Sequence, residues 1–293
     1  MWGVWGLISK AATRVASDAT ILVISTLGVL PAGLAMLLSK NLKQGKNRPL
    51  GCAYGFAAGV CGHTGNLMLL QSLSGGGDSS IVLPLTGMFP LVTVILAVVL
   101  LKERMNTVQV GGIVLALAAL YLFNVTDPTA GGQAAFWASL SAPWMRAALA
   151  ALTLWGVSGV LQKLATDQIS AELSTLCFAL GFVPVAAVVA MLFPVQWALP
   201  TLGAWLLVLL FGLFIGFGTL VLFVAYRDGK ASIVTPVYAL YPAVTALLAV
   251  PVFGERLDLW RGAGIVVAVL AAIALSYELP DASLGTAATE AGS

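Results

Sequence analysis

Two parts of the chain carry one pattern: residues 77–116 read GDSSIVLPLTGMFPLVTVILAVVLLKERMNTVQVGGIVLA, and residues 229–268 read GKASIVTPVYALYPAVTALLAVPVFGERLDLWRGAGIVVA. The second copy is displaced by 152 positions, from 77 to 229. Apolar composition repeats Leu and Val by chance, but it does not keep proline and paired charges in register. The informative pairs are Pro84/Pro236, Pro90/Pro242, Thr93/Thr245, Glu103/Glu255, Arg104/Arg256 and Gly112/Gly264. The chain therefore contains an internal duplication.

The starts of the two halves match as well. Residues 1–13 read MWGVWGLISKAAT and residues 154–166 read LWGVSGVLQKLAT. This register aligns Trp2/Trp155, Gly3/Gly156, Gly6/Gly159, Lys10/Lys163 and Thr13/Thr166. We expect a first repeat at 1–124, a linker at 125–143, a second repeat at 144–278 and a disordered, small and polar tail at 279–293.

Composition places the chain in a membrane. Of its 293 residues, 60% are hydrophobic and 9% are charged, and the mean hydropathy is +1.00. A soluble domain carries about 25% charged residues. Apolar segments recur from Ile21 to Tyr277 and are long enough to cross a bilayer, which predicts an all-α integral membrane protein with about ten transmembrane helices. We expect these helices up to about residue 14 and at about 20–39, 50–72, 80–101, 107–124, 144–167, 173–194, 201–226, 232–253 and 259–278.

Several classes of protein are excluded or disfavoured. No basic patch could hold nucleic acid, and no P-loop motif could couple transport directly to ATP. Cys52, Cys61 and Cys177 lie in apolar segments without CxxC spacing, so neither a metal site nor a disulfide framework is expected. Gly156-Val157-Ser158-Gly159 resembles an intramembrane serine-protease motif, but Ser158 aligns with Trp5 in the other repeat, which favours a packing role. We predict no catalytic residues, no bound metal and no cofactor.

Each repeat holds an odd number of helices, so the second copy is expected upside down relative to the first, as inverted repeats are in transporters. Short loops rich in Lys and Arg face the cytoplasm. The densest cluster of positive charge is Lys40, Lys43, Lys46 and Arg48. We therefore expect this loop and both termini to be cytoplasmic, and the protein to reside in the cell (inner) membrane.

The paired motifs resemble those of the EamA-type drug/metabolite transporter superfamily. In each half a Trp-Gly helix ending in lysine is followed by a proline-containing helix, a Glu-Arg pair and a Gly-led last helix. The resemblance covers about residues 1–278. It implies two inverted five-helix repeats that move a small organic solute by alternating access. It also implies that the first, third, fourth, sixth, eighth and ninth helices surround a central cavity.

Polar residues inside a membrane are costly, so each is a candidate for function. His63 and Asn66 are three residues apart on one predicted helix, and no ionisable residue stands at the matching level of the other repeat. They could bind solute, with a proton as a candidate coupling ion because histidine titrates near neutrality, or they could only hydrogen-bond neighbouring helices. We expect them to face the cavity, near aromatic residues of 144–167 and 232–253.

Aromatic residues on the cavity-forming helices are further candidates for solute binding, because apolar walls with few polar groups suit organic ligands. They are Trp2, Trp5, Trp155, Tyr238 and Tyr241, with Thr86 included because it aligns with Tyr238. Membrane-interface belts would explain some of them equally well.

The expected partners are a small-molecule solute and the lipid bilayer, and the oligomeric state is left open. Two alternatives to a metabolite transporter remain at this point. One is a flippase for a lipid-linked sugar or another amphiphile, and the other is a non-transporting membrane receptor or scaffold.

Overall fold

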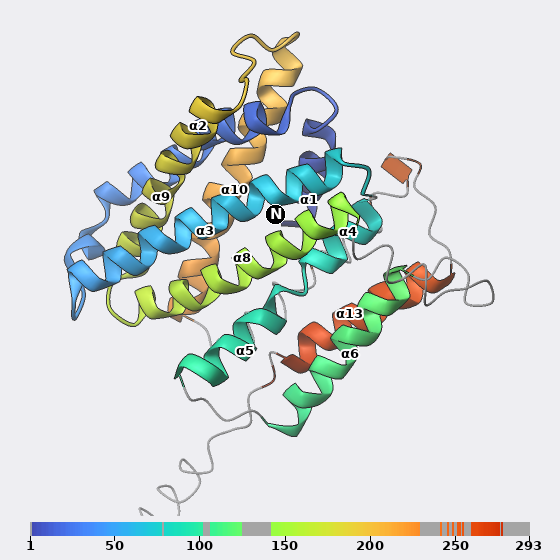
Figure 1. Ribbon diagram of the computed structural model, residues 1–293. Helices are drawn as coiled ribbons and strands as arrows, with labels where there is room; N and C mark the ends of the chain where they lie inside the picture. Colours follow the sequence, from blue (N-terminus) through green and yellow to red (C-terminus); the bar gives the residue numbers. More distant parts are fainter. Residues whose placement is uncertain are drawn as a thin grey trace, which may run out of the picture.

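The computed structural model describes residues 2–77, 79–101, 106–124, 142–228 and 259–275, together with positions 241, 245, 248, 251–252, 254 and 277. Within this part of the chain every regular element is a helix (Figure 1). The α-helices are α1 (Trp2–Ala12), α2 (Asp18–Ala35), α3 (Arg48–Ser74), α4 (Ser79–Thr86), α5 (Phe89–Leu101), α6 (Thr107–Asn124), α8 (Pro143–Thr166), α9 (Ala171–Leu192), α10 (Leu202–Asp228) and α13 (Leu259–Leu275). Two short 3₁₀ helices, η1 (Met36–Leu38) and η2 (Lys40–Lys43), follow α2.

Local sequence explains where these helices begin. The side chains of Ser17, Asn47 and Ser170 accept hydrogen bonds from backbone N–H groups in the first turns of α2, α3 and α9. Such N-caps satisfy donors that have no partner within the helix. Pro31 and Pro184 lie inside α2 and α9, so both helices continue through an interior proline.

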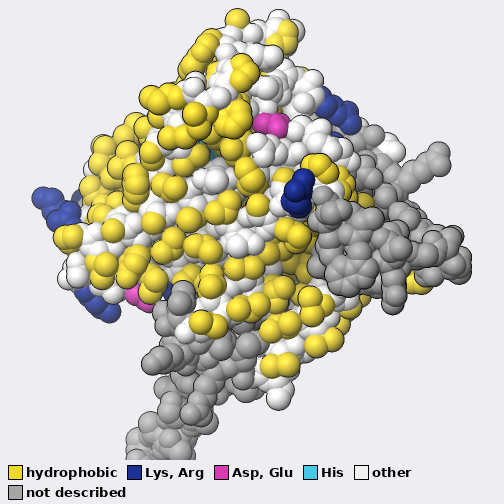
Figure 2. Space-filling model, in the orientation of Figure 1, with side chains coloured by type: hydrophobic (Ala, Val, Ile, Leu, Met, Phe, Trp, Pro, Cys, Tyr) yellow, Lys and Arg dark blue, Asp and Glu magenta, His cyan; other side chains and the backbone are white. Residues whose placement is uncertain are grey.

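The all-helical, membrane-spanning class is also supported. Four described helices are long and apolar enough to cross a bilayer: Asp18–Leu38, Pro143–Thr166, Ala171–Leu192 and Leu202–Phe223. Their outward faces carry exposed apolar side chains such as Leu27, Val188 and Leu206. In Figure 2, apolar side chains are spread over the part of the visible surface that is not grey, and most of the Lys and Arg side chains in view stand near its edge. This distribution suits a surface in contact with lipid tails.

One predicted helix is wrong as drawn from the sequence. The segment 80–101 forms two helices, α4 and α5, separated by a turn at Gly87 and Met88. Pro90 has no N–H with which to continue the ladder to the Thr86 carbonyl, so the helix restarts instead of bending. In transporters, interrupted helices accompany binding sites at mid-membrane.

Other expectations fall outside the described residues. These are most of the helix at 232–253, most of the linker at 125–143, the tail at 279–293 and both Glu-Arg pairs. The observed ends of the remaining helices agree with the predicted ends to within a few residues, as expected for boundaries taken from one sequence.

The arrangement is built around a few helix pairs. In Figure 1, α3 and α8 run side by side through the middle, with α2, α9 and α10 on one flank and the adjacent α6 and α13 on the other. The pair α3 and α8 joins the two halves, as do α3 with α9 and α2 with α10.

Hydrogen bonds between the halves come in matched pairs. The Thr93 hydroxyl of α5 donates to the Gly156 carbonyl of α8 over 3.1 Å, and the Thr245 hydroxyl donates to the Gly3 carbonyl of α1 over 2.9 Å. Thr93 aligns with Thr245 and Gly3 aligns with Gly156 in the duplicated sequence. Each half therefore donates an equivalent threonine hydrogen bond to a glycine carbonyl of the other half.

Close approaches between helix backbones also occur in repeat-related pairs. Gly59 of α3 faces the Phe178 carbonyl of α9, and Gly212 of α10 faces the Ser25 carbonyl of α2. A Cβ atom at either glycine would collide with that carbonyl oxygen. These glycines serve close helix packing, since a stripe of small residues lets backbones approach.

A seam of backbone hydrogen bonds joins the halves at the end where α3 begins. The loop 39–47 pairs with residues 168–170: Lys46 N–H donates to the Gln168 carbonyl (2.7 Å), and Ser170 N–H donates to the Gln44 carbonyl (3.2 Å). Gly45 and Ile169 form an antiparallel bridge. The basic loop is therefore held against the second half.

Candidate solute-binding region

The most aromatic part of the interior surrounds Trp5 of α1, which is 2% exposed. Its ring lies 5.5 Å from Phe211 of α10 in a stacked arrangement and 5.9 Å from Trp155 of α8. Trp2 and Tyr241 lie 5.7 and 6.5 Å from it. We call these five residues the aromatic cluster. They come from both halves, and offset or edge-on ring pairs at such distances are mutually attractive.

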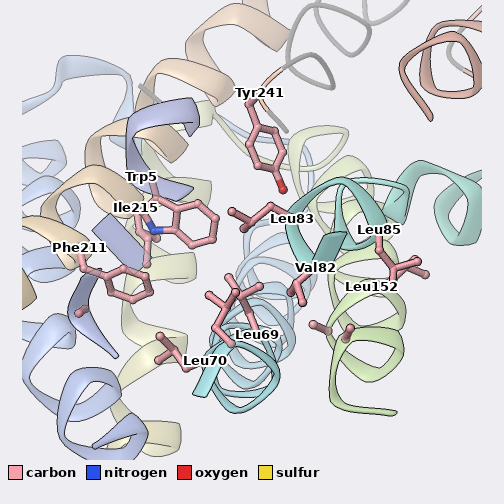
Figure 3. Close-up of a cluster of buried hydrophobic side chains, with 14 of the residues drawn as sticks. Trp5, Leu69, Leu70, Val82, Leu83, Leu85, Leu152, Phe211, Ile215 and Tyr241 are labelled. Atoms are coloured by element: carbon pink, nitrogen blue, oxygen red, sulfur yellow. The ribbon is translucent and has the colours of Figure 1, made fainter. Parts of the chain in front are cut away.

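Aliphatic side chains complete this region. Figure 3 shows Trp5 and Tyr241 facing Leu83 of α4, with Leu69 and Leu70 of α3 on the adjoining side. The five labelled residues are buried. Elements α1, α3, α4, α8, α10 and the segment containing Tyr241 therefore meet here, and these are the elements that the resemblance implied would surround a cavity.

Glycines seat the two repeat-related tryptophans. A Cβ atom at Gly65 of α3 would meet the Trp155 ring at 2.5 Å, and one at Gly218 of α10 would meet the Trp2 ring at 2.8 Å. The same pairing occurs in both copies, because Gly65 aligns with Gly218 just as Trp2 aligns with Trp155. The indoles can lie flat against a neighbouring helix only because no side chain is there.

One buried polar group in this region has no hydrogen-bond partner among the described residues. The buried indole N–H of Trp5 has no acceptor among the described residues, whereas that of Trp155 donates to the Gly62 carbonyl over 3.2 Å. The amide of Asn66, one turn before Leu69 and Leu70, is also buried. A buried donor without a partner costs free energy unless a ligand satisfies it.

His63 lies in a different place from the one expected. Its ring is 0% exposed and stacks on Phe182 of α9, with a centroid distance of 4.0 Å, and its Nε2 lies 3.0 Å from the Thr26 hydroxyl of α2. Its contacts thus come from α2 and α9, not from the tryptophans of the aromatic cluster. Helix rotation explains the difference: Gly62 and Gly65 turn toward α8 and α9, which leaves His63 at the seam with α2.

The contacts of His63 are consistent with a proton on Nε2. The Thr26 hydroxyl lies 3.1 Å from the Leu22 carbonyl, to which it can donate while it accepts from the histidine, and on this arrangement we assign the proton to Nε2. The Nδ1 lone pair is then buried and has no partner among the described residues. Nδ1 is the atom that a proton would occupy.

The histidine has no copy in the second repeat. His63 aligns with Gly216 of α10, where an added Cβ would approach the Ala32 Cβ to 2.9 Å and the Val29 carbonyl to 3.1 Å. The helices that hold an imidazole in one half thus close directly on each other in the other half. The two repeats therefore share the helix arrangement, whereas the buried histidine is found in the first repeat alone.

The remaining predicted residues do not join the aromatic cluster through a described contact. Thr86 is buried, and its hydroxyl donates within its own helix to the carbonyls of Val82 and Leu83. Tyr238 lies outside the described residues. In the GxSG segment, Ser158 donates to the Ala58 carbonyl (2.8 Å) and accepts from Gln162, which is an interhelical packing role.

Sequence reasoning missed three contributors: Thr26, Phe182 and Phe211. Phe182 and Phe211 align with Val29 and Ala58 of the first half. The sequence signal that could have identified these two phenylalanines is an aromatic residue in one repeat aligned with a smaller residue in the other. Among the described residues, no group of three or more His, Cys, Asp or Glu side chains could hold a metal ion.

The apolar helices, the exposed apolar side chains on their outward faces and a buried aromatic region shared by two repeats define a polytopic membrane protein. The chain belongs to the EamA-like transporter family, whose family model matches residues 1–125 and 142–277. It is thus a member of a family of membrane transporters of small solutes.

Two individual proteins are similar to the chain. An uncharacterized protein of Methanocaldococcus jannaschii is 29% identical over 106 residues, which make up 36% of this chain and 75% of that protein. A solved structure, described only as a crystal structure of a protein, matches with a TM-score of 0.63 at 18% identity, covering 93% of this chain and 91% of the other. The structural likeness supports the overall fold.

Proposed function

We propose that the protein is a secondary transporter that carries a small organic solute across the membrane by alternating access. The aromatic cluster is the proposed binding region. The observation that supports this most directly is Trp5: a buried indole N–H without an acceptor among the described residues, enclosed by rings from both halves. A solute bound between halves can be released to either side as they rock.

The chemistry of the region narrows the solute class. Its described walls are aromatic and aliphatic, and the Trp5 N–H has no acceptor among the described residues. Such walls suit an uncharged or amphipathic organic molecule with at least one hydrogen-bond acceptor. A lipid-linked sugar or other amphiphile is the competing solute, and a receptor or scaffold would carry none.

The proposed architecture is an inverted repeat, with 1–124 and 144–278 related by a two-fold axis in the membrane plane. The exchanged bonds support it: Thr93 to Gly156, and Thr245 to Gly3. A two-fold relation has this property, since residue i of one copy contacts j of the other and j contacts i. The relative from M. jannaschii is also compatible, because 106 residues make up 75% of it, so it is about 140 residues long, near half of 293.

His63 is the proposed proton-coupling group. The bare Nδ1 can accept a proton, but the ring is sealed by Thr26 and Phe182. Neither contact residue titrates near neutrality. Proton access then requires α2 or α9 to move away from α3, which would link protonation to the conformational change.

The experiment is solute counterflow in proteoliposomes with a panel that spans uncharged organic solutes and amphiphiles. Trp5→Ala should abolish counterflow of the accepted solute. Trp5→Phe keeps a ring but removes the N–H, and a lost hydrogen bond of about 1.5 kcal/mol weakens solute affinity about tenfold. The matched control is Trp197→Phe, the same change at a residue that is 67% exposed in the α9–α10 loop.

Three outcomes are informative. Normal counterflow in Trp5→Ala would reject the aromatic cluster as the binding region. Counterflow of lipid-linked sugars alone would identify a flippase. No counterflow of any member in wild type, with folded protein in the vesicles, would favour a scaffold.

A further inference from the structure

We propose that Cys52 and Cys177 form an oxidisable thiol pair whose disulfide would fasten the two halves of the protein together. Cys52 belongs to α3 of the first half and Cys177 to α9 of the second. Both lie in apolar segments, for which the sequence predicted no disulfide framework. Their place in the fold gives them a further property, because the pair bridges an interface that alternating access has to rearrange.

The two cysteines are neighbours in one small apolar cluster. Cys177 packs with Ile169 and Leu173, and Cys52 packs against this group from α3. The two thiols lie close enough to interact directly, and both are free. A disulfide requires that the backbones come near each other, usually with Cα atoms within about 7 Å.

A glycine brings the backbones together at this level. Gly55 follows Cys52 by three residues and so lies on a neighbouring part of the α3 surface. A Cβ atom added to Gly55 would lie 3.1 Å from the Cβ of Cys177. The chain of α9 therefore passes close to α3 at the level of the two cysteines.

The pair lies beneath the seam between the halves. Ile169 of the cysteine cluster forms the backbone bridge with Gly45. Just above it, the buried carboxylate of Glu172 accepts a hydrogen bond from the Asn41 amide over 2.9 Å. Noncovalent contacts thus already hold this end of the molecule together, and a disulfide would make the closure covalent.

The repeat-related loop at the opposite end of the molecule also contacts the other half. There the α9–α10 loop contacts the start of α2 through the Gln196 N–H, which donates to the Thr20 hydroxyl over 2.9 Å. In the aligned repeats, Cys177 and Cys52 correspond to Ile24 and Trp205. The thiol pair is therefore particular to the end that carries the basic loop.

The chemistry needs a two-electron oxidant, and we name a peroxide. Cys52 is half-buried and Cys177 is 8% exposed, so Cys52 is the thiol that a peroxide reaches. Its thiolate attacks one peroxide oxygen, forming a sulfenic acid and releasing hydroxide, which takes up the proton that the thiol lost. The sulfur of Cys177 then displaces the sulfenic oxygen as water. Two thiols and one hydrogen peroxide become one disulfide and two waters.

The test is a thiol count on the purified full-length protein after hydrogen peroxide treatment. Maleimide labelling under denaturing conditions should fall from three thiols to one, with recovery on reduction. Peptide mapping should find residue 52 joined to residue 177. Cys52→Ser and Cys177→Ser should each abolish the link. The matched control, Cys61→Ser, alters the other half-buried thiol of α3 and should leave the link intact.

Retention of three free thiols, conversion of Cys52 to sulfinic acid without a link, or a link that includes Cys61 would overturn the proposal. The effect on transport rests on the proposed function and is read separately. Counterflow of the accepted solute should fall to the level of empty vesicles on oxidation and return on reduction. Undiminished counterflow with the disulfide formed would overturn the fastening role. Counterflow absent in both states would count against the transport function, because the thiol count stands without it.

Discussion

At the scale of single residues, the role open to His63 depends on the side chains that surround it. An intramembrane histidine could be a solute ligand, a proton carrier or an interhelical bond. The structure gives it one bond through Nε2, one aromatic face on Phe182 and one lone pair with no partner among the described residues. That combination is compatible with a group that acts only when the surrounding helices part.

We predict that His63→Gln removes the pH dependence of transport while leaving expression intact. Glutamine can keep a donor toward Thr26, but it cannot titrate near neutrality. The measurement is counterflow of the accepted solute between pH 5.5 and 8, with Thr26→Val as a companion that loses the bond but keeps the imidazole. Identical pH profiles in wild type and His63→Gln would reject the coupling role.

Gly59 allows a second prediction at this scale. Alanine at Gly59 places a methyl group on the Phe178 carbonyl, and overpacking of this kind costs about 1–3 kcal/mol. Gly111→Ala is the control, because nothing lies within 4 Å of its added Cβ in the described structure. Thermal unfolding of the purified variants should show a lower midpoint for Gly59→Ala and little change for Gly111→Ala. Equal unfolding midpoints for the two variants would show that the helices accommodate the added methyl group without a loss of stability.

At the scale of elements, the end of α3 is tied to α1 and α2. The ammonium of Lys10 in the last turn of α1 donates to the Leu73 carbonyl (3.2 Å) and the Gly77 carbonyl (3.1 Å), and the Ser74 hydroxyl donates to Asp18 (2.7 Å). Unpaired carbonyls at a helix C-terminus favour a cation. Lys10 thus caps the C-terminal end of a neighbouring helix.

We predict that Lys10→Met destabilises the fold by about 1–3 kcal/mol, because charge-assisted hydrogen bonds to backbone carbonyls are lost. Lys10→Arg should retain most of the stability. Lys43→Met is the control, since Lys43 is exposed in the basic loop. The readout is the unfolding midpoint in detergent. A Lys10→Met midpoint equal to that of Lys43→Met would contradict the capping role.

At the scale of the whole molecule, the loops sort onto two ends. The basic loop 39–47 is hydrogen-bonded to residues 168–170, so both lie at one end. The α9–α10 loop meets the start of α2 through Gln196, at the other end of α2. The length of α2, 18 residues, separates the two positions by about 27 Å at 1.5 Å per residue, close to the thickness of a bilayer core.

We predict that labels added at Lys43 and Asp167 react from the cytoplasmic side, and that a label at Trp197 reacts from the opposite side. The experiment introduces single cysteines at these positions in a cysteine-free background and applies a membrane-impermeant maleimide to intact cells and to inverted vesicles. The basic loop should be cytoplasmic because Lys and Arg in short loops set orientation. Labelling of Lys43→Cys in intact cells would reverse the assignment, and labelling of all three positions from one side would refute the arrangement.

The sequence by itself determined the class, the duplication and the family. Low charge and long apolar segments require a membrane, and the recurrence of proline, tryptophan and Glu-Arg pairs requires two related halves. It also placed most helices to within a few residues, because capping residues such as Ser17 and Ser170 mark where they start. These are properties of composition and local chemistry, which a single chain displays directly.

Only the tertiary structure decided which faces of those helices meet. When a helix is apolar on all sides, its sequence does not show which face packs against protein and which faces lipid, because both environments are apolar. For this reason the sequence put His63 beside the tryptophans, whereas the structure puts it on Phe182, and it did not bring Cys52 to Cys177. Close approaches at Gly55, Gly59 and Gly212 fix the rotation, and they depend on carbonyl and side-chain positions more than a hundred residues away.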